Sequence, residues 1–158
     1  MTSNLRLAQR LAIAVPALAL AGAWLSQYAG GLPPCEMCWW QRYAHLAALA
    51  LALAALPLHR LRAGLLALAA LAICLSGVIG GFHAGVEYGW WPGITTCAQP
   101  TGLAGGTDPL AAIMAAPLVR CDVAPWTLLG VSLAGWNALY SMLAGLGLFR
   151  LLGLRERP

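Results

Sequence analysis

Cysteine is the residue type in this sequence most able to do chemistry, because thiols exchange disulfides or bind metal ions as thiolates. The chain has five cysteines. Cys35 and Cys38 form a C-x-x-C motif, Cys97 and Cys121 form a second, widely spaced group, and Cys74 lies between the groups. Cys74 is flanked by apolar residues, so we interpret it as a small apolar packing residue. The other four are the candidates for chemistry.

Three kinds of chemistry fit four such cysteines: redox exchange, structural cross-linking and zinc binding. A disulfide across two intervening residues removes little chain entropy and so contributes little stability. This argues against a purely structural role for Cys35 and Cys38. Four ligands would suffice for zinc, but nothing else nearby suggests a zinc-binding module. The pattern therefore favours redox chemistry.

The neighbours of Cys38 favour a reactive thiol. We expect Cys38 at the start of a helix, where the helix dipole stabilises an anion. Arg42 follows four residues later on the same helix face, whereas Glu36 opposes the effect. Taken alone, Arg42 is better interpreted as an interfacial arginine that extends to lipid headgroups. The spacing C-x-x-C-x-x-x-R at the start of a membrane helix is what favours the functional interpretation.

The elements that position these cysteines are apolar. Of 158 residues, 61% are hydrophobic and only 9% charged, whereas a soluble domain carries roughly a quarter charged residues. This excludes a water-soluble globule and a disordered chain. Four uncharged segments are each about long enough to cross a bilayer as a helix. We predict an all-α membrane protein, a four-transmembrane-helix bundle in one domain, residues 1–158, with spans at about 11–30, 39–58, 63–86 and 125–149.

The arginines predict the orientation of these spans. All nine basic residues are arginine, and seven fall on one side of the four spans: Arg6, Arg10, Arg60, Arg62, Arg150, Arg155 and Arg157. Short arginine-rich loops stay in the cytoplasm. Both termini should therefore be cytoplasmic, and loops 31–38 and 87–124 should face outward. The positive charge is a topology signal, so no nucleic-acid partner is expected. Residues 110–118 have the spacing of a short interfacial helix.

The whole pattern resembles the disulfide bond formation protein B family. The resemblance rests on the motif at 35–38, on Arg42, on Cys97 and Cys121 in the second outer loop, and on the PWTLLG segment at 125–130. Together with the four spans, it covers essentially the whole chain. Members of this family are multi-pass proteins of the bacterial inner membrane, with their cysteine loops in the periplasm.

The resemblance implies two redox-active disulfides, Cys35–Cys38 and Cys97–Cys121. A periplasmic thioredoxin-fold thiol oxidase (DsbA-like) would be the partner. Its reduced form would attack Cys97, the freed Cys121 would attack Cys35, and Cys38 would be released.

The resemblance also implies a membrane quinone, ubiquinone or menaquinone, as electron acceptor, and no metal. Arg42 and His83 would bind this cofactor. His45, one turn further along than Arg42, could also line the pocket, although the family motif does not supply it. Membrane lipid would surround the four helices.

A zinc-binding membrane protein remains open at this point, and so do two other functions. The first is a quinone oxidoreductase like vitamin K epoxide reductase, in which the loop pair precedes the C-x-x-C, the reverse of the order here. The second is a structural membrane subunit with disulfide-stapled loops.

Overall fold

The computed structural model describes residues 3–95 and 119–153. These residues form four long helices: α1 (Ser3–Tyr28), α2 (Glu36–Ala54), α3 (Arg62–Glu87) and α5 (Leu133–Gly153). Two short strands, β1 (Thr127–Leu128) and β2 (Val131–Ser132), pair antiparallel just before α5. The prediction of an all-α helical bundle is confirmed, apart from this small hairpin.

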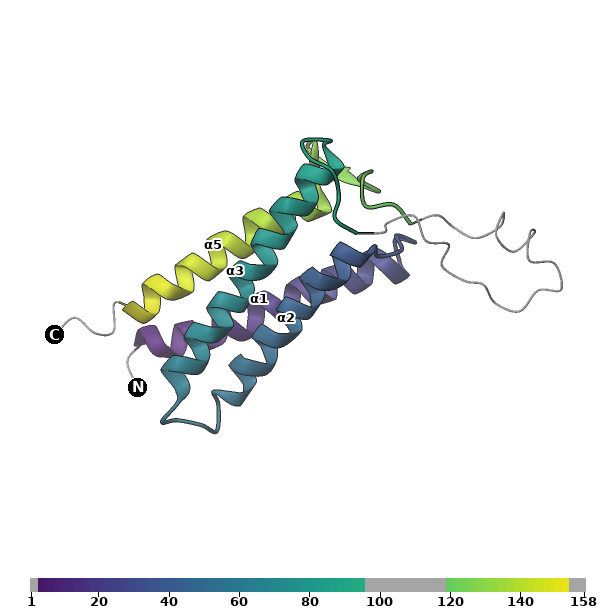
Figure 1. The fold of residues 1–158 in the computed structure, drawn as a ribbon. Helices are drawn as coiled ribbons and strands as arrows, with labels where there is room; N and C mark the ends of the chain where they lie inside the picture. Colours follow the sequence, from purple (N-terminus) through teal and green to yellow (C-terminus); the bar gives the residue numbers. More distant parts are fainter. Residues whose placement is uncertain (1–2, 96–118, 154–158) are drawn as a thin grey trace.

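The four helices pack side by side as one bundle (Figure 1). α3 packs mainly on α5 and α2, and α1 packs on α2 and α5. α1 begins and α5 ends at one end of the bundle, where the short α2–α3 connection also lies. α2 therefore begins, and α3 ends, at the opposite end. The functional side chains described below come from this second end.

Small residues allow the helices to approach closely. The core between them is rich in fully buried alanines, including Ala8, Ala12, Ala48, Ala52, Ala69 and Ala70. On α3, a Cβ added to Gly80 would lie 2.9 Å from the Ala134 carbonyl oxygen of α5. Such contacts are typical of helices that associate in lipid.

Two of the helices, α1 and α3, are long and apolar enough to cross a membrane. Large apolar side chains also cover the outside of the bundle, among them Leu18, which is 67% exposed, and Leu143, which is 74% exposed. These observations agree with a membrane environment. As far as the structure describes them, α2 and α5 do not meet the same requirement of length and apolar character. The number of four membrane spans therefore stays a prediction.

The predicted start of the last span differs from the structure. Residues 127–132 form the hairpin, and α5 begins only at Leu133. Leu129 and Gly130 have φ angles of 53° and 78°, which suit a two-residue turn and end any regular helix. Cys97 and the predicted interfacial helix at 110–118 lie outside the described residues.

Candidate active site

The C-x-x-C motif sits at the N-terminus of α2. Cys35 is the residue that caps this helix, and its Sγ accepts a hydrogen bond from the Cys38 backbone N–H at 3.3 Å. Both cysteines are free thiols, with their Sγ atoms 3.0 Å apart. The expected Cys35–Cys38 disulfide would be the oxidised form of this dithiol.

The two thiols differ in environment. Cys35 is 5% exposed, whereas Cys38 is only partly buried. Cys35 donates its S–H to Cys38 Sγ. This hydrogen bond, followed by burial, raises the pKa of the Cys35 thiol far above its usual range. The arrangement leaves Cys38 as the acceptor of the shared hydrogen bond.

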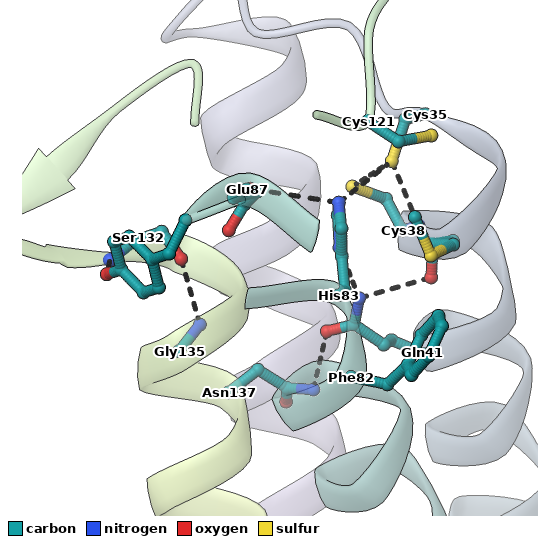
Figure 2. A network of polar contacts seen from close by, with 12 residues as sticks. Cys35, Cys38, Gln41, Phe82, His83, Glu87, Cys121, Ser132, Gly135 and Asn137 are labelled. Carbon is teal, nitrogen blue, oxygen red and sulfur yellow. Dashed lines mark hydrogen bonds and ion pairs between the residues drawn. The ribbon is translucent and has the colours of Figure 1, made fainter. Parts of the chain in front are cut away.

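Cys121 lies against this dithiol although it is 83 residues away from Cys38 in the chain. Its side chain is 1% exposed and packs in one apolar cluster with Cys35, Met37 and Val86. Figure 2 shows Cys121 directly beside Cys35. Cys121 takes part in a disulfide. The structure therefore brings a cysteine of the second loop to the C-x-x-C motif of the first.

His83 lies next to the same thiols, as expected for a site residue. It is fully buried on α3, and its Nε2 lies 3.5 Å from Cys35 Sγ and 3.7 Å from Glu87 Oε1. The amide nitrogen of Gln41 lies 3.0 Å from its Nδ1 (Figure 2). Since that nitrogen can only donate, Nδ1 accepts and the proton of the neutral ring belongs on Nε2. His83 therefore presents an N–H toward Cys35.

Arg42 is held inside the bundle against α1. It is 6% exposed and donates to Gln27 Oε1 at 2.6 Å and to the Ala23 carbonyl oxygen at 3.1 Å. Its guanidinium also lies 5.0 Å from the centre of the Trp39 ring. These anchors disfavour the alternative that Arg42 extends outward to lipid headgroups.

A cavity of about 790 Å³ joins these residues. Four of the five candidate site residues within the described ranges line it: Cys35, Cys38, Arg42 and His83. Its remaining wall comes largely from apolar residues of α1 and α5, including Leu18, Leu20, Leu133 and Trp136. A mostly apolar pocket of this size with a few polar groups is typical of a small-molecule site, and it fits the flat, weakly polar headgroup of a quinone.

A chain of polar residues continues from His83 into the bundle. Gln41 Oε1 accepts from Asn137 Nδ2 at 2.8 Å, and Asn137 Oδ1 accepts from His45 Nε2 at 3.0 Å. Sequence reasoning did not identify Gln41, Glu87 or Asn137. The available signal was the presence of polar residues within apolar segments, which are costly in a membrane and mark functional positions.

The same dithiol could also bind a metal ion when reduced. Ligand atoms of Cys35, Cys38 and His83 all lie within 4.8 Å of one another. This set is not the four-cysteine zinc site considered from the sequence, because Cys121 is in a disulfide.

Comparison with known proteins identifies the family. The family model described as "Disulfide bond formation protein DsbB" matches residues 5–151. The chain belongs to the disulfide bond formation protein B (DsbB) family. A curated relative, "Disulfide bond formation protein B" of Verminephrobacter eiseniae (strain EF01-2), is 33% identical over 164 residues. The alignment covers 93% of this chain and 88% of the relative. No solved structure is significantly similar to the chain.

Membership of the DsbB family confirms the resemblance found from the cysteine pattern. It supports a disulfide oxidoreductase role in disulfide bond formation and a membrane association.

Proposed function

We propose that this protein is a quinone-dependent protein disulfide oxidoreductase that reoxidises a periplasmic thioredoxin-fold thiol oxidase (DsbA-like). The observation that carries the proposal is the burial of Cys121 in one cluster with Cys35, at the edge of the cavity. Thiol–disulfide exchange needs an attacking sulfur beside the sulfur that it attacks. The cluster provides this proximity between the two loops.

The relay begins at a Cys97–Cys121 disulfide, whose pairing we propose because Cys121 is disulfide-bonded and Cys97 belongs to the same loop. A thiolate of the reduced partner attacks Cys97, the Cys97–Cys121 bond breaks, and Cys121 leaves as a thiolate. The second thiol of the partner then attacks the mixed disulfide, which oxidises the partner and frees Cys97.

The second exchange reduces the C-x-x-C. Cys121 attacks Cys35 of an oxidised Cys35–Cys38 pair, and Cys38 leaves as a thiolate. Cys97 then attacks Cys121, which restores the loop disulfide and frees Cys35. Two electrons and two protons have moved from the partner to the Cys35–Cys38 dithiol.

The cavity residues prepare this dithiol for oxidation. A quinone bound in the cavity would accept the two electrons and two protons, so that Cys35 and Cys38 return to a disulfide. Arg42 contributes a fixed positive charge on the face of α2 that also carries Cys38. His83 holds its Nε2 proton beside Cys35 Sγ and stabilises negative charge there.

We further propose that the chain crosses the bacterial inner membrane four times, with both termini in the cytoplasm and the cysteine end in the periplasm. The arginine distribution supports this orientation. A C-terminal fusion to green fluorescent protein should fluoresce, and a fusion of alkaline phosphatase after residue 95 should be active. The reverse pattern would contradict the orientation.

The contact between the two loops can be tested by cross-linking. In a Cys38→Ser, Cys97→Ser double variant, only Cys35 and Cys121 remain in the site, and mild oxidation should join them by a disulfide. Peptide mass spectrometry detects this bond. A Cys35→Ser, Cys97→Ser variant is the matched control, because there Cys121 would have to reach Cys38. Failure of the folded first variant to form the Cys35–Cys121 bond would contradict the relay.

A further inference from the structure

His45 is a buried polar residue of the cavity that the proposed relay does not use. It lies on α2, is 3% exposed and lines the same cavity as Cys38 and Arg42. These three residues are spaced four and three apart, so they share one face of the helix. Cys38 and His45 are then about 10 Å apart along the helix axis. His45 thus lies deeper in the cavity than the dithiol.

The hydrogen bonds around Asn137 determine which nitrogen of His45 carries a proton. Asn137 Nδ2 lies 3.2 Å from the Ser76 carbonyl oxygen, which can only accept, so this side of the amide is the NH₂ group. The other side, Oδ1, faces His45 Nε2 at 3.0 Å. Since Oδ1 can only accept, the proton of the neutral His45 ring belongs on Nε2.

The second nitrogen, Nδ1, is therefore a bare acceptor. It is shielded from solvent and has no hydrogen-bond partner among the described residues. A buried acceptor without a donor is energetically unfavourable, because it has lost its hydrogen bond to water and gained none in return. Such an atom, on a side chain that lines a cavity, indicates a ligand that brings a donor with it.

The two redox forms of a quinone differ in this property. The carbonyl oxygens of the oxidised form can only accept hydrogen bonds, whereas the hydroxyl groups of the quinol donate. We propose that His45 Nδ1 accepts a hydrogen bond from a quinol hydroxyl, so that the cavity binds the reduced headgroup more tightly than the oxidised one. This inference rests on the proposed function.

Preferential binding of the quinol affects the direction of electron flow. A site that binds the reduced form of a couple more tightly makes the bound oxidised form a stronger oxidant. His45 would thereby favour transfer of electrons from the Cys35–Cys38 dithiol. It is a binding residue for the product and does not touch the reacting sulfurs.

Two substitutions separate a ligand contact from a structural contact. His45→Gln keeps an N–H close to the position of Nε2, and with it the bond to Asn137, but removes the Nδ1 acceptor. His45→Asn keeps an acceptor close to Nδ1 but loses the donor to Asn137. The two variants therefore change one nitrogen each.

The experiment measures equilibrium binding of decylubiquinone and decylubiquinol to the oxidised, detergent-purified protein under anaerobic conditions. We expect the wild type to bind the quinol more tightly than the quinone. His45→Gln should weaken quinol binding about tenfold, the equivalent of one hydrogen bond, and leave quinone binding within about twofold. His45→Asn should retain more of the quinol preference.

The possible failures are distinguishable. Equal binding of the two forms by the wild type overturns the inference whether or not the variants fold. So does a folded His45→Gln variant with an unchanged quinol preference. If the wild type binds neither form, the proposed quinone dependence fails as well.

Discussion

The reactivity of the site depends on how its two neighbouring thiols differ in burial and hydrogen bonding. Cys35 is buried and gives its proton to a hydrogen bond with Cys38 Sγ. Cys38 lies in the first turn of α2, where it is partly buried and lines the cavity. Only Cys38 combines access with a helix N-terminus and a nearby arginine, which together favour a nucleophilic thiolate.

Alkylation of the reduced protein should show that the two thiols react at different rates. Iodoacetamide should modify Cys38 faster than Cys35 between pH 7 and 9, because the raised pKa of Cys35 keeps that thiol protonated throughout this range. Peptide mass spectrometry at short reaction times gives both rates. Faster modification of Cys35 would show that the thiols have the opposite roles.

Arg42 should act on the quinone half of the reaction alone. We expect Arg42→Met to slow reduction of added ubiquinone by about tenfold or more, since a buried charged hydrogen bond contributes about 1.5–3 kcal/mol. Attack of the partner on Cys97 should change by less than about twofold, because the proposed relay gives Arg42 no part in that step. Stopped-flow measurement of each half-reaction separates the two effects.

Gln27→Leu provides the control for Arg42. It removes the 2.6 Å hydrogen bond that anchors the guanidinium to α1 but keeps the charge. This variant should therefore slow quinone reduction less than Arg42→Met does. A larger effect from Gln27→Leu would mean that the anchor, and not the charge, is what the site requires.

At the scale of elements, the close approach of α3 and α5 holds the polar chain in place. Gly80 of α3 lies against the backbone of Ala134, and Asn137, one turn further along α5, bridges to Gln41 of α2. Any separation of α3 from α5 would move Asn137 relative to the cavity.

A pair of glycine substitutions tests this packing. Gly80→Ala should lower stability by about 1–3 kcal/mol, because its Cβ would lie 2.9 Å from the Ala134 carbonyl oxygen. Gly64→Ala, in the same helix with nothing within 4 Å of the added Cβ, should instead raise stability by about 1 kcal/mol through helix propensity. Thermal unfolding in detergent measures both. Equal shifts for the two variants would show that α3 and α5 do not depend on this contact.

The helices could be predicted from the sequence because charge interrupts the apolar segments close to where three of the helices end. The hairpin before α5 could not, since Thr127–Ser132 continues an uncharged apolar segment and only Gly130 hints at a turn. The four loop cysteines and Arg42 could be predicted from residue type and spacing, and His83 from the resemblance to the family. Gln41 and Asn137 were not, because their pairing depends on the register of α2 against α5, which no local pattern records.

At the scale of the whole molecule, the bundle separates its two ends chemically. At the end where α2 begins and α3 ends lie the two thiols of the C-x-x-C, the disulfide-bonded Cys121 and His83. Arg60 and Arg62 lie at the α2–α3 connection, at the opposite end of the bundle (Figure 1). The cavity lies between α1, α2 and α5 at the thiol end. A lipid-soluble acceptor can approach such a site from within the membrane, while a soluble partner approaches from the aqueous side.

The central claim is that the Cys35–Cys38 dithiol passes its electrons to a quinone. The most direct measurement mixes the fully reduced protein with a ubiquinone analogue under anaerobic conditions and follows both the thiols and the quinone. We predict that Cys35 and Cys38 become a disulfide as one quinone is reduced for each pair of thiols lost, and that Cys38→Ser protein produces no quinol. Dithiol that persists beside unreduced quinone in the wild-type protein would contradict the account.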